Sequence, residues 1–233
     1  MSELTPYLAL AILPVAVSIP LEPISFLWGW KHRFEPMPPD VAEKSERFRR
    51  YAFFPGDLVA IVLVLFLTLR NSVTISQLGL SLASWERKAL IGCGLGMVWI
   101  GLDWSVTRIA FPTSRPRPSL FQKGPVSLWI VIFLSGSFAE ELWRALCIIA
   151  LKETAHSKFF IVTVTALVFS IAHIWGGGLV RTLGKFPFGV AAAVAFIWTG
   201  SLLTTCVFHF MANVSGLYWT RRRNRGQRFV PGG

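Results

Sequence analysis

Two neighbouring carboxylates and a guanidinium lie inside an apolar stretch of this 233-residue chain. Residues 140–144 read Glu-Glu-Leu-Trp-Arg, and the apolar stretch around them runs from Pro125 to Leu151. At the centre of a bilayer each charged side chain costs roughly 2.5–3.5 kcal/mol on insertion scales. A segment that served only as a membrane anchor would carry Leu or Ile at these positions. The cluster therefore indicates a function.

Three more polar side chains lie in later apolar segments, namely His173, His209 and Asn213. A carboxylate and an imidazole can polarise a water for attack on a carbonyl group, and an amide can donate a hydrogen bond to the oxyanion that forms. Glu140, His173 and His209 are also a ligand set for zinc or another divalent metal. The residue types therefore favour hydrolysis and leave its metal dependence open.

Helical spacing relates the three charged residues to one another. At about 100° per residue, Arg144 lies about 40° from Glu140 and about 60° from Glu141, so it can reach either carboxylate. We expect Arg144 to neutralise one glutamate while the other faces elsewhere. That arrangement suits one structural and one catalytic carboxylate.

Two further pairs share a helix face because their members are four residues apart: His209 with Asn213, and Phe169 with His173. The Phe169 ring can wall off the imidazole. Each pattern also has a structural alternative. The Glu-Glu-Arg group can be a structural ion pair. His209 and Asn213 can form a hydrogen-bonded pair between helices. His173 can be a core histidine whose ring nitrogens are hydrogen-bonded. Their coincidence on successive segments favours chemistry.

The elements that must position these residues are predicted to be membrane helices. The chain is 53% hydrophobic and 15% charged, whereas a soluble domain is about a quarter charged. Because helices satisfy their own backbone groups in lipid, we predict an all-α fold, a polytopic membrane helix bundle of about seven transmembrane helices. The predicted segments are residues 7–30, 53–69, 89–110, 125–151, 159–175, 186–198 and 202–219.

We divide the chain into three parts. Residues 1–124 hold the N-terminal helices and loops, residues 125–219 a four-helix catalytic core, and residues 220–233 a basic tail. Residues 70–88 are mildly amphipathic, and we expect them to lie on the membrane surface. Thr199-Gly200-Ser201 predicts a tight turn.

Three smaller features lie within the predicted helices. Gly92 and Gly96 predict a face that packs closely on another helix. We expect Asp103 to pair with Arg144 or with another helix. The three cysteines show no metal spacing and are expected to be small core residues.

The distribution of Lys and Arg predicts the orientation in the membrane. With the N-terminus outside, 17 of the 23 basic residues fall in the inside segments 31–50, 108–123, 181–185 and 221–228. The positive-inside rule then places the C-terminus in the cytoplasm, where the basic tail can contact anionic lipid. No aromatic-basic platform accompanies the net charge of +11, so no nucleic-acid partner is expected. The short loops favour the plasma (inner) membrane of a bacterium.

Three motifs occur in order, each on an apolar segment: Glu140-Glu141 followed closely by Arg144, Phe-x-x-x-His at residues 169–173, and His-x-x-x-Asn at residues 209–213. Over about residues 125–219 this pattern resembles the CPBP intramembrane proteases. That family includes type II CAAX prenyl proteases and bacteriocin-processing or immunity proteins.

The resemblance implies an intramembrane metalloendopeptidase that acts on a membrane-embedded or lipid-modified peptide. Glu140 with His173 would activate a water, directly or through a divalent metal, for which zinc is the first candidate. His209 and Asn213 would hold the tetrahedral oxyanion. The resemblance says nothing of the oligomeric state.

The spacing departs from the family pattern, in which three residues separate the glutamate pair from the arginine. Here only Leu142 and Trp143 intervene. Aligned on the pair, Glu140 is the base, and Glu141 with Arg144 orders the helix. Aligned on the arginine, Glu140 takes the second glutamate position. We favour Glu140 as the base, with Glu141 as the alternative.

Two other classes of function fit parts of the pattern. A non-proteolytic scaffold or immunity-type protein can be built on the same fold. A transporter or proton relay would also use buried carboxylates and histidines. The absence of an inverted repeat with paired broken helices in the sequence argues against the transporter.

Overall fold

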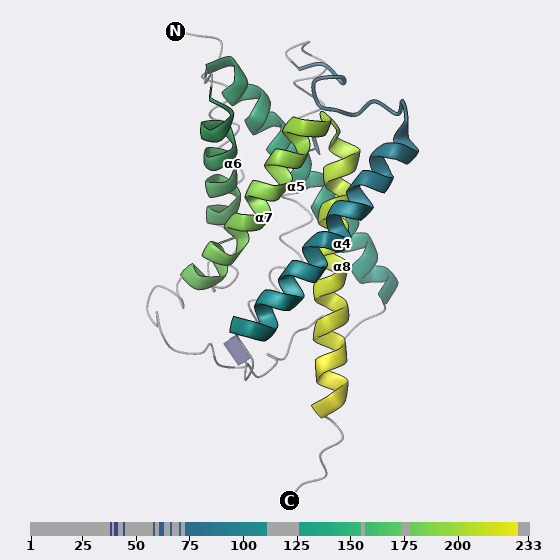
Figure 1. Cartoon of the computed structure of the whole chain (residues 1–233), viewed down its shortest axis with the longest axis vertical. Helices are drawn as coiled ribbons and strands as arrows, with labels where there is room; N and C mark the ends of the chain where they lie inside the picture. The colour runs from purple at the N-terminus through teal and green to yellow at the C-terminus, as the bar shows by residue number, and fades with distance from the viewer. Residues whose placement is uncertain are drawn as a thin grey trace, which may run out of the picture.

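Five α-helices form the described part of the chain (Figure 1). The computed structural model describes residues 73–110, 126–154, 157–173 and 178–227, together with single positions between residues 38 and 70. Within these ranges no strand occurs, so the predicted all-α class is confirmed there. The helices are α4 (Trp85–Ala110), α5 (Val126–Thr154), α6 (Lys158–Ala172), α7 (Gly178–Thr199) and α8 (Leu202–Gln227).

Several predictions fall on the N-terminal part of the chain. The predicted segment 7–30, the loop 31–50 and most of segment 53–69 lie outside the described residues, as does most of the loop 108–123. The predicted boundaries of the three parts of the chain stay predictions.

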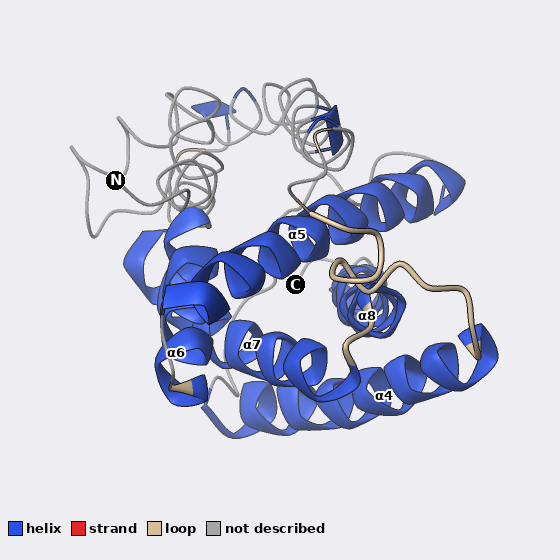
Figure 2. Ribbon diagram, turned by 90° about the horizontal axis from the view of Figure 1, so that it is seen from above, coloured by secondary structure: helices blue, strands red, loops and turns tan. Residues whose placement is uncertain are grey.

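Helix α8 occupies the middle of the bundle. It contacts α4, α5 and α7, while α6 packs against α5 and α7. Seen from above, α4 and α5 lie on opposite sides, with α7 and α8 between them (Figure 2). Helix α5, which carries the glutamate pair, therefore contacts both of the other helices that carry predicted site residues, α6 and α8.

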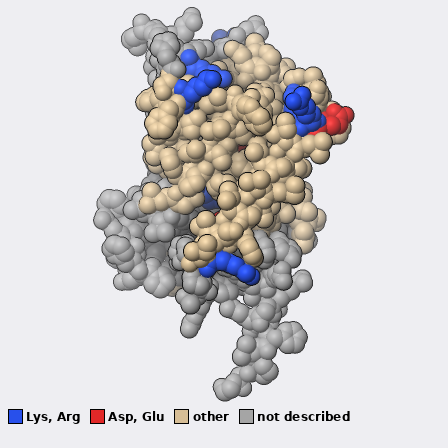
Figure 3. Space-filling view, viewed as in Figure 1, with Lys and Arg blue, Asp and Glu red and all other residues tan. Residues whose placement is uncertain are grey.

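The described surface suits a bilayer. One helical stretch, Trp85–Val106 of α4, is long and apolar enough to cross a membrane, and shorter apolar helices are found in α6, α7 and α8. On the face shown in Figure 3, most visible Lys and Arg side chains lie near the upper and lower edges of the surface formed by the described residues, and the area between them is largely uncharged. The number of spans stays a prediction.

Helix α7 begins earlier than predicted. Its first residue is Gly178, so Arg181 and Lys185 lie within a helix and the predicted loop 181–185 is wrong. The predicted segment began at residue 186, next to Pro187, and proline lacks the N–H that a helix interior uses. The structure places Pro187 inside α7, where packing along α6 outweighs this local signal. Helix α8 likewise continues beyond its predicted end, to Gln227.

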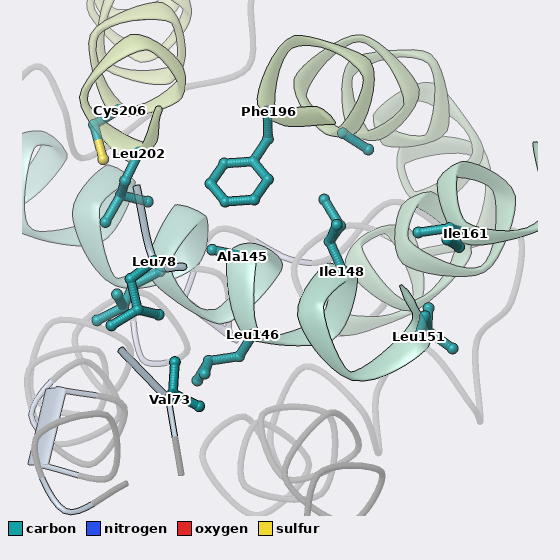
Figure 4. Close-up of a cluster of buried hydrophobic side chains, with 12 residues drawn as sticks. Val73, Leu78, Ala145, Leu146, Ile148, Leu151, Ile161, Phe196, Leu202 and Cys206 are labelled. Atoms are coloured by element: carbon teal, nitrogen blue, oxygen red, sulfur yellow. The ribbon is translucent and has the colours of Figure 1, made fainter. Parts of the chain in front are cut away.

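The expected position of residues 70–88 on the membrane surface stays a prediction. Turns occupy residues 75–79 and α4 begins at Trp85. Val73 and Leu78 are only 1% and 0% exposed, because they enter a core cluster formed with side chains of α5, α6, α7 and α8 (Figure 4). These two side chains therefore attach the segment to the core, while residues 74–77 and 80–87 are exposed.

The predicted tight turn at residues 199–201 is confirmed, and Gly79 packs against it. Gly200 has φ +58°, and Ser201 Oγ accepts a hydrogen bond from the Thr204 N–H at 3.2 Å, which caps α8. Gly79 O accepts from the Leu202 N–H at 3.1 Å. A Cβ on Gly79 would lie 2.5 Å from Gly200 O, so glycine is required for this approach.

The predicted glycine face on α4 is confirmed by its contacts with α8. A Cβ on Gly92 would lie 2.6 Å from Thr204 O, and one on Gly96 would lie 2.8 Å from Met211 Cβ. These two glycines let the helices approach closely. Cys147 and Cys206 are buried as predicted, Cys93 is partly buried, and all three are free thiols.

Candidate active site

Glu141 is the centre of a buried network of charged hydrogen bonds. Arg144 Nε donates to Glu141 Oε2 at 2.9 Å, and Arg144 Nη2 donates to Oε1 at 3.1 Å. His209 Nδ1 lies 2.8 Å from the same Oε1. The side chains of Glu141 and Arg144 are both 0% exposed. The burial of both charges is tolerated because each has hydrogen-bonded partners.

Arg144 also joins α5 to two other helices. Its Nη1 donates to Gly189 O of α7 at 3.3 Å, and its guanidinium carbon lies 4.2 Å from the centroid of the Phe169 ring of α6. The predicted pairing of Asp103 with Arg144 is wrong, because Asp103 is exposed on α4 and Arg144 pairs with Glu141. Its pairing with another helix stays a prediction. Arg144 therefore links the buried Glu141 on α5 to α6 and α7.

Glu140, one residue earlier, faces the two imidazoles. Its Oε2 lies 3.6 Å from His209 Nε2 and 3.7 Å from His173 Nε2. The Glu140 side chain is 30% exposed, yet this oxygen is buried and has no hydrogen-bond partner. Burying an unpaired carboxylate oxygen is costly, so the arrangement leaves room for a group that bridges the three side chains.

His173 is held at the end of α6. It is the C-cap residue of that helix, and its Nδ1 lies 2.8 Å from Phe169 O. Because a carbonyl oxygen only accepts, Nδ1 carries the proton and Nε2 presents a lone pair towards Glu140. The Phe169 and His173 rings are 4.5 Å apart, centroid to centroid, so the predicted contact between them is confirmed.

Asn213 lies one turn after His209 on α8 and reaches across to α5. Its Nδ2 donates to Ser137 Oγ at 3.1 Å. Ser137 is fully buried and lies three residues before Glu140, on the same helix. The structure thus brings Asn213 to the helix that carries the glutamate pair.

Some residues of the site were not anticipated. Ser137 carried a weak signal, since it is a hydroxyl in an apolar segment close to Glu140. Phe188, whose ring lies 4.7 Å from that of His209, and Gly189, whose carbonyl accepts from Arg144, carried none. Both lie on α7, which has no polar motif, so only the packing of α7 against the other helices identifies them.

The residue types at Glu140 are those of a divalent-metal site, and the separations of Glu140 Oε2 from the two imidazole nitrogens can be compared with such a site. As folded, no group of three His, Cys, Asp or Glu side chains in the described ranges is arranged as a metal site. Two ligand atoms of one tetrahedral zinc, each about 2.05 Å from the metal, are about 3.4 Å apart. The separations here are 3.6 and 3.7 Å. Glu141 also supplies the carboxylate that commonly orients a metal-bound histidine.

The fold and the site together define a class, that of helical bundles with carboxylate and imidazole side chains clustered among apolar helices. Residues 122–215 match the family described as Type II CAAX prenyl endopeptidase Rce1-like. This match confirms the resemblance to the CPBP family over these residues, which include every predicted site residue. Proteins of this family are integral membrane proteins. No curated protein and no solved structure matches the chain.

Proposed function

We propose that the protein is an intramembrane endopeptidase that hydrolyses a peptide bond of a membrane-associated substrate. The family match supports an endopeptidase of the CAAX type. The single observation that carries the proposal is the unpaired Glu140 Oε2, with the Nε2 atoms of His173 and His209 at 3.7 and 3.6 Å. A water at about 2.8 Å from two such atoms bridges them without strain.

Glu140 acts as the general base in this proposal. Its Oε2 takes a proton from the bridging water while the water oxygen attacks the carbonyl carbon of the scissile bond. The same carboxyl group then gives the proton to the leaving nitrogen as the C–N bond breaks, so the base is regenerated. His173 Nε2, a lone-pair acceptor, orients the water during the attack.

The surroundings favour Glu140 over Glu141 in this role. Both oxygens of Glu141 accept hydrogen bonds from Arg144, and one accepts from His209 as well. A base needs a free lone pair within reach of the water, and Glu141 is 0% exposed whereas Glu140 is 30% exposed. Asn213, anchored on Ser137 through one N–H of its amide, is the proposed donor to the oxyanion.

A divalent metal would be held by Glu140, His173 and His209, with zinc favoured by the nitrogen and oxygen ligands. When bound, it would lower the pKa of the attacking water and polarise the carbonyl. The roles of Arg144, Glu141 and Asn213 are the same with or without it.

We further propose a multi-pass protein of a bacterial inner membrane, of about seven spans by apolar length, with its C-terminus in the cytoplasm. The substrate would be a membrane-embedded or lipid-modified peptide. The exposed large hydrophobic side chains of the described helices support access from the lipid.

The proposal is tested by cleavage of a membrane-anchored, prenylated peptide by the purified protein in nanodiscs. Glu140→Gln and His173→Gln are expected to lower kcat by at least about 100-fold, the lower end of the effect of general acid–base catalysis. Gly94→Ala is the control, because a Cβ there meets nothing within 4 Å. Full cleavage by Glu140→Gln would contradict the proposed role of Glu140, whereas a wild-type protein that cleaves no peptide would favour a scaffold or immunity-type function.

Cleavage measured in the presence of a chelator tests whether the protein requires a metal. Loss of cleavage in chelator, with recovery on addition of zinc, would show that a metal is required. Full activity in chelator would show that Glu140 and His173 activate the water by themselves. Metal content measured on the same preparations guards against loss of activity for other reasons.

A further inference from the structure

Helix α7 carries a lysine, Lys185, in the middle of its buried face. At about 100° per residue, the buried side chains of Phe188 and Phe196 lie about 60° and 20° from Lys185 around the helix axis. The exposed side chains of Leu183 and Val194 lie about 160° and 180° from it, on the opposite face. Lys185 itself is partly buried. Its side chain therefore belongs to the face of α7 that packs on the bundle, whereas the opposite face is the one exposed to lipid.

This face of α7 meets the candidate active site. The Phe188 ring lies 4.7 Å from the His209 ring, centroid to centroid, and Lys185 lies about one helical turn, roughly 5.4 Å, nearer to the start of α7. His173 ends α6, and α6 packs along α7. The positive charge of Lys185 acts electrostatically on the His173 imidazole. The charge thus lies at the edge of the site, on the side of His173.

A lysine that points into an apolar bundle is costly, and in membrane proteins such a residue commonly marks a substrate pathway. The two carboxylates of the site have other contacts: Glu141 is bound by Arg144, and Glu140 faces the two imidazoles. An ammonium group carries three N–H donors, so a contact of Lys185 within the protein still leaves donors for a bound group. Because Lys185 is only partly buried, a bound group can reach it.

We propose that Lys185 binds a carboxylate of the peptide substrate and so selects peptides that present one close to the scissile bond. The inference rests on the proposed function of the site. A peptide carries carboxylates at its C-terminus and on Asp and Glu side chains, and either source gives the same charge-assisted hydrogen bond to an ammonium. This bond is stronger where water is largely excluded, and its loss is expected to lower kcat/KM about tenfold or more.

The alternative is a purely structural lysine. A cation near the C-terminal end of a helix such as α6 stabilises that end through its carbonyl groups. A lysine with this role would be indifferent to the charge of the substrate. The two roles therefore differ in one measurable quantity, the ratio of kcat/KM for a peptide with a free C-terminal carboxylate to kcat/KM for the same peptide with a C-terminal amide.

This acid-to-amide ratio is measured with prenylated, membrane-anchored peptides in nanodiscs of phosphatidylcholine, whose headgroup has no net charge to compete for the lysine. The wild-type ratio is expected to be at least about 10, mainly through KM. A third peptide, with a C-terminal amide and an aspartate as its last residue, identifies the source of the carboxylate. Cleavage as fast as that of the acid shows that a side chain also serves, and cleavage as slow as that of the amide shows that the C-terminal group is the one bound.

Substitutions at Lys185 connect the ratio to this residue. Lys185→Met removes the charge and keeps an unbranched side chain, and it is expected to bring the ratio to within about threefold of 1. Lys185→Arg keeps the charge and should keep the preference. Lys152→Met is the matched control, because Lys152 is an exposed lysine in the last turn of α5, about 18 Å along that helix from Glu140, and it should leave the wild-type ratio unchanged.

Two results would overturn the inference. One is a wild-type protein that cleaves neither carboxylate peptide faster than the plain amide. The other is a Lys185→Met protein that keeps the wild-type ratio. If Lys185→Met does not fold, Lys185→Gln gives the same comparison, because it also removes the charge.

A binding measurement separates this inference from the proposed function. If the wild type cleaves no peptide, the proposed function fails, and fluorescence anisotropy of labelled acid and amide peptides on the same nanodiscs then decides the role of Lys185. Tighter binding of the acid that is lost in Lys185→Met would support the carboxylate site. Equal affinities for the two peptides would overturn it.

Discussion

The division of labour between two adjacent glutamates is set at the scale of single residues. Spacing along one helix places Arg144 closer in angle to Glu140, at about 40°, than to Glu141, at about 60°. In the folded chain Arg144 pairs with Glu141 instead. The reason is that His209 and Gly189 approach α5 from the side of Glu141, so their hydrogen bonds complete a network there. Glu140 is left to face the histidines.

Two buried hydroxyl groups, of which only one is hydrogen-bonded, test how Asn213 is oriented. Ser137 Oγ accepts from Asn213, whereas Thr165 Oγ1 is buried without a hydrogen-bond partner. Ser137→Ala is expected to lower kcat roughly fivefold to tenfold, because an oriented amide is worth about 1 kcal/mol when one hydrogen bond holds it. Kinetics of peptide cleavage measure this effect.

Thr165→Val is the matched variant, since it also removes a buried hydroxyl but changes no hydrogen bond. It should leave kcat unchanged and raise the free energy of unfolding by about 1 kcal/mol, because an unpaired buried hydroxyl is removed. Equal losses of kcat in both variants would contradict the proposed orientation of Asn213 by Ser137.

At the scale of elements, the approach of α4 to α8 depends on two small residues. Helix α8 carries His209 and Asn213, so the packing of α4 on its other side holds these residues against α5. The sequence predicted the glycine face but not its partner. A GxxxG pattern specifies that a helix can be approached closely, and any other helix of the bundle would satisfy it.

The same substitution at two positions of α4 tests this contact. Gly92→Ala is expected to destabilise the protein by about 1–3 kcal/mol, because its Cβ would lie 2.6 Å from the backbone oxygen of Thr204 and the helices would have to separate. Gly94→Ala meets open space and should stabilise α4 by up to about 1 kcal/mol through helix propensity.

Thermal unfolding in detergent measures both variants, with about 2–4 °C expected per kcal/mol for a protein of this size. A fall in Tm for Gly94→Ala as large as that for Gly92→Ala would show that the effect comes from the loss of glycine and not from the contact with α8. Peptide cleavage should fall only in Gly92→Ala, because α8 would then move.

For the whole molecule, the distribution of charge predicts an orientation that the fold does not test. The described helices expose apolar side chains along their lengths, which suits a bilayer but is the same for either orientation. Lys and Arg near the ends of the spans break this symmetry. Since Arg181 and Lys185 lie in the first turns of α7 rather than in a loop, they count towards the inside only if that end of α7 is at the cytoplasmic surface.

Reporter fusions at the C-terminus and after residue 156 test the orientation. We expect a reporter at the C-terminus to be active in the cytoplasm, because it follows the basic tail. We expect a reporter after residue 156 to be active on the opposite side, because only Lys152 and Lys158 lie in that segment. A C-terminal reporter active outside the cytoplasm would reverse the proposed topology.

The sequence by itself determined the helical class, the three motif-bearing helices and the identity of the polar residues in them. Charges inside apolar segments are visible without a structure because their cost in lipid is large and local. Helix length was less well predicted. Pro187 is a strong local signal, yet the packing of α7 on α6 extends the helix through it.

Only the tertiary structure decided which carboxylate is free, where Asn213 points and which groups enclose the histidines. The contacts between Glu141 and His209 and between Asn213 and Ser137 join residues 68 and 76 positions apart in the chain. Helical periodicity relates residues within a few turns of one helix, and it carries no information on the rotation of one helix against another. That rotation follows from side-chain packing across the bundle, and here it leaves Glu140 facing two imidazoles.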